Sequence, residues 1–372
     1  MRIGFDAKRM FRNFSGLGNY SRSTLELMCK YHPDNSYLLF SAYDENRVGF
    51  VIPERVECVT PTGIACDISP SLWRSVSMAH DIRRRRVDIY HGLSNELPFD
   101  VRRSGAKSVV TVHDLIFVRY PNLYKKVDRM LYTYKYKKSC QLADRVIAIS
   151  RQTKNDLMEF WNIPEEVIDV VYQGCNPIFY KRADDAVIAS VRAKYGLPET
   201  FILSVGTIEE RKNLMLTVKA MAEGKIDLPL VACGRKTPYA DAIMEYAAMQ
   251  GIADRIIMLH DVEMADLPAI YAMALVVVYV SLFEGFGIPI LEALNVGVPV
   301  VTTKGGVFGE TGGDACAYVG PYDVDEMIET LGKISGDTIL RQSMIDKGRL
   351  WAARFTDEAV AEELNAVYRK LM

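Results

Sequence analysis

The 372-residue sequence lacks several features that would mark particular protein classes. No apolar run approaches the ~20 residues of a membrane span. The start, MRIGFDAKRM, predicts a charged strand rather than a signal peptide. The cysteines form no CxxC pair, which favours free, mostly buried thiols over disulfides or a zinc site; they stand at positions 29, 58, 66, 140, 175, 233 and 316. We therefore expect a globular protein of the cytoplasm, with the inner face of the membrane as a second setting.

Charge is nearly balanced overall but unevenly divided along the chain. Residues 1–178 carry 26 Lys and Arg against 20 Asp and Glu, whereas residues 179–372 carry 19 against 27. This division indicates different partners for the two halves, or complementary surfaces between them. The overall balance of −2 argues against nucleic acid as a partner.

Two basic stretches lie in the first half, RRRR at 83–86 and YKKVDRMLYTYKYKKS at 124–139. The second predicts a helix. It either lies on anionic membrane headgroups or is a solvated helix whose Tyr and Leu side chains pack inward.

Short apolar runs alternate with helical segments throughout the chain and predict eleven strands. They lie at 2–7, 36–41, 88–92, 108–114, 145–150, 168–174, 201–206, 228–234, 255–260, 275–280 and 298–303. Continuously apolar strands between helices are typical of parallel sheets covered on both faces. The fold class is therefore α/β, with two Rossmann-like doubly wound domains at 1–178 and 179–355. The final helix at 356–372 could pack on either domain.

The segment SLFEGFGIPILEALNVGVPVVTT at 281–303 places Glu284 and Glu292 eight positions apart at the end of a strand. Pro289 is suited to the first turn of a helix that Gly297 would close. Glu284 then lies on the loop and Glu292 near the first turn, leaning toward the helix N-terminus. Both acids can face one ligand.

A phosphate site is predicted beside them. VGTIEERKNL at 205–214 follows a strand, and it sets Arg211 and Lys212 just before a helical run. Carboxylates would repel a diphosphate, so the two glutamates should accept hydrogen bonds from hydroxyl groups. A ligand with hydroxyl-rich rings on both sides of a diphosphate is a nucleotide sugar. From spacing alone this is one hypothesis among several, because a loop acid and a helix acid occur together in many proteins.

The same segment resembles the E-x7-E signature of glycosyltransferase family 4, retaining enzymes of the GT-B fold. VGTIEERKNL is similar to that family's phosphate-binding segment, and SGLGNYSRSTLEL (15–27) to its N-terminal glycine loop. DIYHGLSNELP (88–98), TVHDLIFVRYP (111–121) and DRVIAISRQTKNDL (144–157) also resemble the family, so the likeness covers nearly the whole chain.

The resemblance implies a donor held by the C-terminal domain, an acceptor held by the N-terminal domain, and a last helix that returns to the N-terminal domain. It also implies roles for individual residues. Glu284 would contact the transferred sugar, with His113 near it, and Glu292 would bind the ribose. The remaining donor-binding residues would be Gly16, Gly18, Gly206, Arg211, Lys212, Gly285, Phe286, Gly287 and Ile288. Val280 and Thr207 depart from the family pattern, and this leaves the base and sugar preferences open.

Charge development then predicts the chemistry. Arg211, Lys212 and the helix N-terminus near 289 would stabilise a departing diphosphate, so we expect no metal and no other cofactor. Asp323 in the DVD at 323–325 more plausibly caps the following helix. The resemblance, rather than the charges, implies the substrates: a hexose, best assigned as mannose, would move from a GDP- or UDP-sugar to a glycan or lipid-linked glycan in surface polysaccharide assembly.

Alternatives remain at this stage. They are another GT-B enzyme, such as a nucleotide-sugar epimerase or a phosphorylase, and a non-catalytic nucleotide-sugar-binding partner subunit. A nicotinamide enzyme is disfavoured because the loop with Gly16 and Gly18 starts about nine residues past the first strand.

Overall fold

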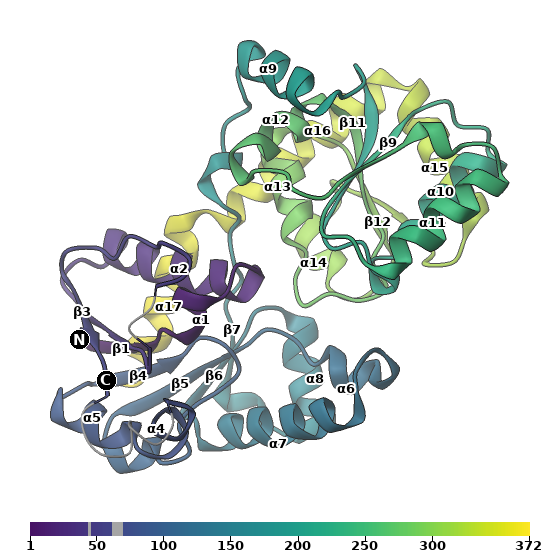
Figure 1. Ribbon diagram of the computed structural model, residues 1–372. Helices are drawn as coiled ribbons and strands as arrows, with labels where there is room; N and C mark the ends of the chain where they lie inside the picture. Colours follow the sequence, from purple (N-terminus) through teal and green to yellow (C-terminus); the bar gives the residue numbers. More distant parts are fainter. Residues whose placement is uncertain (44–45, 62–69) are drawn as a thin grey trace. The chain divides into compact units, whose positions relative to one another are not determined.

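The computed structural model describes residues 1–43, 46–61 and 70–372, and it divides into two compact units. Unit 1 comprises Met1–Gln173 and Thr356–Met372, and unit 2 comprises Gly174–Phe355 (Figure 1). The first segment of unit 1 thus ends at Gln173, ahead of the boundary at residue 178 that the sequence predicted. The reason is local packing, since the ring of Phe179 contacts Tyr271 and the amide of Asn295 contacts Cys175, both within unit 2.

Unit 1 is built on a seven-stranded parallel sheet in the order β3-β2-β1-β4-β5-β6-β7. Its strands are β1 (Arg2–Asp6), β2 (Ser36–Phe40), β3 (Val56–Val59), β4 (Ile89–Gly92), β5 (Lys107–Val112), β6 (Arg145–Ala148) and β7 (Ile168–Val170). Unit 2 has a six-stranded parallel sheet in the order β10-β9-β8-β11-β12-β13. Its strands are β8 (Phe201–Val205), β9 (Leu230–Cys233), β10 (Ile256–Leu259), β11 (Ala274–Tyr279), β12 (Val300–Thr303) and β13 (Ala317–Val319).

All eleven predicted strands are present, and the α/β doubly wound class is confirmed in both units. The sequence missed β3 and β13, which both lie at a sheet edge. Neither forms a continuous apolar run, because β3 is the partly exposed VECV and β13 has only three residues.

Helices cover both faces of each sheet. In unit 1 they are α1 (Lys8–Arg12), α2 (Gly16–Tyr31), α4 (Pro70–Val76), α5 (Met78–Arg84), α6 (Ile116–Arg119), α7 (Lys126–Leu142), α8 (Arg151–Trp161) and α17 (Asp357–Arg369). In unit 2 they are α9 (Asp185–Tyr195), α10 (Leu214–Glu223), α11 (Pro238–Met249), α12 (Leu267–Met273), α13 (Ile288–Val296), α14 (Phe308–Gly312), α15 (Val324–Gly336) and α16 (Thr338–Ala352).

Neighbouring strand residues of unit 1 enter different cores because successive side chains point to opposite faces. Leu38 and Phe40 pack with residues of α5, α7 and α8, whereas Leu39 packs with residues of α2 and α17. The last helix, α17, therefore completes the core of unit 1. Its Tyr368 is fully buried and donates or accepts a 2.7 Å hydrogen bond with Nδ1 of His91.

Two local predictions about helices in unit 2 are confirmed. Pro289 lies in the first turn of α13, and Gly297 ends that helix with φ of +86°. Asp323 caps α15, because its Oδ1 accepts a 2.9 Å hydrogen bond from the backbone N–H of Glu326.

Six cysteines are described and all are free thiols, four of them buried, whereas Cys58 is exposed. Cys66 lies outside the described residues. Across the described ranges, no helix is both long and apolar enough to cross a lipid bilayer.

Candidate functional site

The loop after β8 carries the two predicted cations. Gly206 ends the strand with φ of +135°, a conformation that favours glycine. A short 3-10 turn at Glu210–Lys212 follows, so Arg211 and Lys212 lie just before α10 as predicted. The aliphatic chain of Lys212 runs 3.4 Å from the point where a Cβ on Gly206 would lie. The strand end thus positions the lysine.

The loop after β11 brings Glu284 to these cations. The backbone N–H of Leu282 donates to the carbonyl of Arg211 at 2.8 Å, which ties the two loops together. Oε1 of Glu284 then lies 2.6 Å from Nζ of Lys212 and 2.8 Å from Nη1 of Arg211. The structure therefore joins three of the predicted site residues into one ion cluster, in which Glu284 is buried and the two cations are partly buried.

Two further contacts hold the cations. Nζ of Lys212 donates to the hydroxyl of Tyr279 at 2.9 Å, and Nη2 of Arg211 donates to Glu209 at 2.7 Å. Lys212 has three N–H groups and two are in use, so the third remains for a ligand. The position also suits an anion, because the carboxyl ends of parallel strands are where open α/β sheets bind ligands.

Glu284 is ionised in this setting. Burial alone would raise the pKa of its carboxyl, but the charges of Lys212 and Arg211 outweigh burial and lower that pKa to about 2. The charge of Glu284 outweighs burial and raises the pKa of the Arg211 guanidinium, so Arg211 and Glu284 both stay charged across the working pH range.

The glycine-rich turn before α13 presents backbone rather than side chains. Gly287 has φ of +118°, and a Cβ there would meet Ile290 at 3.3 Å. The ring of Phe286 is buried against Phe355, with ring centroids 5.7 Å apart. Phe286 can therefore reach a ligand only through its backbone. Ile288, the first residue of α13, and Gly285 are partly exposed.

Glu292 lies one residue beyond the first turn of α13 and is buried. Its Oε2 accepts a 2.6 Å hydrogen bond from the hydroxyl of Tyr271 on α12. Burial raises the pKa of Glu292 to about 7, and the bond from Tyr271 opposes that rise. The two glutamates of the pair thus have very different acidities.

Two tyrosines at this site were not predicted. Tyr279 bonds Lys212, and its pKa is raised well above the usual value by burial and by the nearby carboxylates of Glu284 and Glu292. Tyr271 supports Glu292. Tyr279 could have been proposed as a site residue from the sequence, because it is a tyrosine at the end of an apolar strand. No spacing in the sequence indicated Tyr271.

The predicted glycine loop belongs to unit 1 and is partly helical. Gly16 and Gly18 stand in the first turn of α2 rather than in a free loop. The side chain of Asn13 closes that turn, because its Oδ1 accepts hydrogen bonds from the N–H groups of Ser15 and Gly18 at 2.9 and 3.2 Å. A Cβ on Gly18 would lie 2.0 Å from the carbonyl oxygen of Asn13, whereas one on Gly16 would meet nothing within 4 Å.

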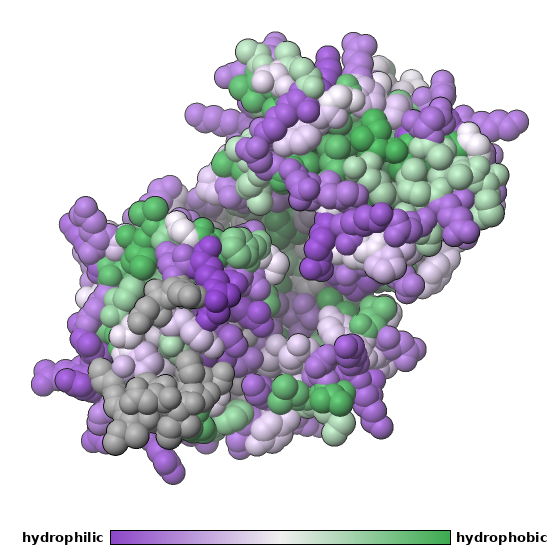
Figure 2. Space-filling view, in the orientation of Figure 1, coloured by the Kyte–Doolittle hydropathy of each residue, from purple (hydrophilic) through white to green (hydrophobic). Residues whose placement is uncertain are grey.

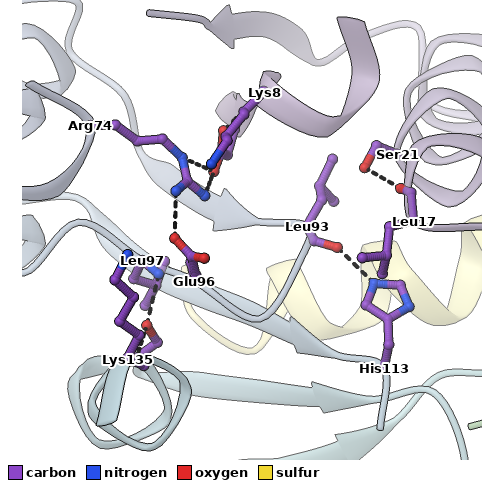
Figure 3. A network of polar contacts seen from close by, with 11 residues as sticks. Lys8, Leu17, Ser21, Arg74, Leu93, Glu96, Leu97, His113 and Lys135 are labelled. Atoms are coloured by element: carbon purple, nitrogen blue, oxygen red, sulfur yellow. Dashed lines mark hydrogen bonds and ion pairs between the residues drawn. The ribbon is translucent and has the colours of Figure 1, made fainter. Parts of the chain in front are cut away.

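His113 follows β5 in unit 1 and is buried (Figure 3). Its Nε2 lies 2.9 Å from the carbonyl oxygen of Leu93, and a carbonyl can only accept, so Nε2 carries the proton. Burial lowers the pKa of His113 to about 4, which keeps the ring neutral. Its Nδ1 therefore holds a lone pair that can accept a hydrogen bond. Tyr20 on α2 packs edge-on at 4.7 Å.

A second polar cluster in unit 1 was missed by the sequence analysis. Arg74 donates to Oδ2 of Asp6 at 2.8 Å through Nε and also bonds Glu96 (Figure 3). Asp6 is the last residue of β1, and Glu96 follows β4, so the cluster lies at the carboxyl edge of that sheet. The three residues are far apart in sequence and no motif links them.

No group of three or more His, Cys, Asp and Glu side chains in the described part of the chain is arranged to hold a metal ion.

Each half of the chain matches a model of a glycosyltransferase family. A model of the group 1 glycosyl transferases matches residues 187–351, and a model of Glycosyltransferase Family 4 matches residues 41–178. The chain is 29% identical over 289 residues to O-antigen chain mannosyltransferase B of Escherichia coli, across 76% of this chain and 74% of that protein. It is 27% identical over 215 residues to O-antigen chain mannosyltransferase RfbU of Salmonella typhimurium, across 58% and 57%.

The match thus spans little more than half the length of the second relative. Among solved structures, sucrose-phosphate synthase from Thermosynechococcus elongatus aligns with a TM-score of 0.80 at 20% identity, across 100% of this chain and 99% of that one. That likeness shows the fold, which is GT-B. The two family matches, one in each half, agree with the motifs read from the sequence, and the chain belongs to the group 1 glycosyltransferases of glycosyltransferase family 4.

Proposed function

We propose that this glycosyltransferase moves a hexose, with mannose as the preferred sugar, from a nucleotide sugar to a glycan or lipid-linked glycan in surface polysaccharide assembly. Configuration at the sugar is retained, and no divalent ion takes part. The observation that carries the proposal is the ion cluster of Glu284 with Lys212 and Arg211 at the ends of β8 and β11. The mannosyltransferase names of the relatives support the choice of sugar.

Unit 2 would hold the donor. The diphosphate would take the third N–H of Lys212 and the backbone N–H of Ile288 at the start of α13, where the helix dipole is positive. Pro289 has no N–H, and the N–H of Ile290 donates to the carbonyl of Gly287. Glu292 would accept hydrogen bonds from the ribose hydroxyls, and Glu284 from hydroxyls of the transferred sugar. Because Glu284 is ionised, it accepts such bonds without first losing a proton.

In the bond-breaking step, the electron pair of the bond between the sugar carbon C1 and the phosphate oxygen passes to that oxygen. The acceptor hydroxyl oxygen forms the new bond to C1 on the same face. Its proton goes to an oxygen of the departing diphosphate. Lys212 and Arg211 stabilise the charge that develops on the diphosphate, and this kind of electrostatic support is commonly the largest catalytic contribution.

Unit 1 would hold the acceptor and contribute His113. The neutral ring has its proton on Nε2, so Nδ1 is suited to accept a hydrogen bond from a sugar hydroxyl. This role needs no change in protonation during the cycle. His113 therefore would act as a binding group and not as a general base.

A thermal-shift screen with GDP-, UDP- and ADP-sugars in EDTA identifies the donor. A ligand present at 100 times its dissociation constant stabilises the folded state by about 2.7 kcal/mol, so one nucleotide class should raise the melting temperature. A GDP-sugar is the expected donor.

Transfer from that donor is then measured with Glu284→Gln, and with Glu329→Gln, at an exposed position of α15, as the matched control. We expect transfer to fall about 100-fold only in the first variant. Nucleotide binding with no transfer or hydrolysis in the wild-type protein would instead favour a non-catalytic binding subunit. The anomeric configuration of the product, read by NMR, tests retention.

A further inference from the structure

Tyr279 makes two different contacts with Lys212. Tyr279 is the last residue of β11, whereas Lys212 lies in the turn after β8, and these two strands are neighbours in the sheet of unit 2. The tyrosine hydroxyl accepts a 2.9 Å hydrogen bond from Nζ of Lys212. The same Nζ lies over the tyrosine ring, 4.7 Å from its centre. The ammonium group therefore has both an oxygen acceptor and an aromatic ring beside it.

The side chain of Tyr279 is itself held in place. It is only 4% exposed, and the ring of Phe308 on α14 packs edge-on against it with the ring centroids 6.2 Å apart. The backbone carbonyl of Tyr279 accepts a 2.7 Å hydrogen bond from the hydroxyl of Thr302 on β12. The hydroxyl of Tyr279 is thus a fixed acceptor that cannot follow movements of the lysine.

Lys212 needs such an acceptor because a lysine side chain is flexible. Hydrophilic side chains project from the surface in Figure 2, and a lysine in that position samples many rotamers. Lys212 is different, since its side chain is only 17% exposed and packs beside Gly206. Its bond to Glu284 fixes one N–H but leaves the ammonium free to rotate about that bond. The bond to Tyr279 prevents this rotation and so fixes the direction of the third N–H.

The hydroxyl of Tyr279 keeps its own proton in this position. Burial raises the pKa of Tyr279 well above its usual value, and the negative charge of Glu284 raises it further. The hydroxyl therefore accepts the bond from Lys212 through a lone pair and stays neutral across the working pH range. A group of this kind orients a neighbour and does not move protons.

We propose that Tyr279 is a positioning residue for the transfer step, which aims the third N–H of Lys212 at the diphosphate without touching the donor itself. The inference rests on the proposed function, because it concerns the same donor site. Negative charge on the diphosphate grows as its bond to the sugar breaks. A correctly aimed N–H therefore stabilises the transition state more than it stabilises the bound donor. Loss of the aiming contact should appear mainly in kcat.

The test is transfer by Tyr279→Phe, which keeps the ring and its packing but removes the acceptor oxygen. We expect kcat to fall about tenfold, whereas KM for the donor should change less than about threefold. The defect should be the same at about pH 6 and about pH 9, because the hydroxyl is neutral at both. Tyr318→Phe is the matched control, since it removes a tyrosine hydroxyl of unit 2 that bonds the carbonyl of Gly313. This control should keep the wild-type kcat and KM.

A second measurement needs no transfer. Nitrogen NMR relaxation of the Lys212 ammonium, identified by the loss of its signal in Lys212→Arg, reports how fast that group rotates in the free protein. We expect slow rotation in the wild type and in Tyr318→Phe, and faster rotation in Tyr279→Phe.

Three outcomes would overturn the proposal. They are wild-type kcat in Tyr279→Phe, equal loss of kcat in Tyr279→Phe and Tyr318→Phe, and a defect in Tyr279→Phe that changes with pH, which would mean that the hydroxyl transfers a proton. A wild-type protein that transfers no sugar would instead count against the proposed function. The NMR result would still decide whether Tyr279 holds Lys212, so the two failures can be told apart.

Discussion

The hydroxyl of Tyr271 donates a 2.6 Å hydrogen bond to Oε2 of Glu292. The two residues lie on consecutive helices, α12 and α13, and both are buried. Tyr271 is itself fixed edge-on against Phe179 at 5.5 Å. The bond sets where the Glu292 carboxylate points, so Tyr271 acts as a positioning residue for the group that we propose binds the ribose.

Tyr271→Phe should therefore weaken donor binding. The ring stays in place, but Glu292 loses its hydrogen bond, and a bond to a charged group contributes about 1.5–3 kcal/mol. We expect KM for the donor to rise about tenfold or more with a smaller change in kcat. The pKa of Glu292 should also rise, because the bond from Tyr271 opposes the effect of burial.

Tyr318→Phe is the matched control. The hydroxyl of Tyr318 donates a 2.6 Å hydrogen bond to the carbonyl of Gly313 and takes no part in the bond between Tyr271 and Glu292. Equal effects of the two changes on KM would show a general loss of packing. They would contradict a positioning role for Tyr271.

Glu292→Gln should make the protein more stable relative to wild type as pH rises. Burial raises the pKa of Glu292 to about 7 from its ordinary value of 4.5. Between these two pH values, the folded state keeps a proton on Glu292 that the unfolded state has already released. Wild-type stability attributable to this group therefore falls between about pH 4.5 and 7. The variant should gain about 1–3 kcal/mol across that window, as measured by urea unfolding. A constant difference between variant and wild type would argue against the raised pKa.

Glu284→Gln should do the opposite. The pKa of Glu284 is lowered to about 2, so its stabilising effect is complete above pH 4.5 and is lost as pH falls toward 2. At pH 7 the variant leaves the partly buried Lys212 without a carboxylate and leaves Arg211 with that of Glu209 alone, so it should lose about 3 kcal/mol in urea unfolding. The loss should shrink below pH 4.5. A loss that does not depend on pH would mean that Glu284 contributes through shape and not through charge.

Substitutions of Gly16 and Gly18, in the first turn of α2, should separate an effect on stability from an effect on transfer activity. Gly18→Ala places a methyl group 2.0 Å from the carbonyl oxygen of Asn13, so the turn must shift and the melting temperature should fall by several degrees. Gly16→Ala meets nothing within 4 Å and should keep the wild-type melting temperature. If Gly16 approaches the donor, its variant alone should lose transfer activity at unchanged stability. Full activity in Gly16→Ala would remove it from the donor site.

The sequence was sufficient where a local pattern determines the structure. Continuous apolar runs predicted the central strands, and Pro289 with Gly297 predicted both ends of α13. It failed for β3 and β13, because short edge strands carry too little apolar pattern. It also placed Gly16 and Gly18 in an open loop, since the capping contacts of Asn13 depend on side-chain geometry.

The candidate site was predictable only in part for a related reason. Lys212 and Glu284 could be proposed from motifs at strand ends. Their partners Tyr279 and Tyr271, and the acidity of Glu292, depend on how separate helices and strands pack. The cluster of Asp6, Arg74 and Glu96 shows the same limit, because its members come from three segments with no shared motif.

The central claim is that Lys212 and Arg211, rather than a divalent ion, neutralise the departing diphosphate. Isothermal titration of the matching nucleoside diphosphate in EDTA and in Mg²⁺ tests it most directly, with Lys212→Ala beside the wild type. We predict equal affinity of the wild-type protein in both buffers and a loss of at least tenfold in Lys212→Ala. Binding that requires Mg²⁺, or that is unchanged in Lys212→Ala, would contradict the account.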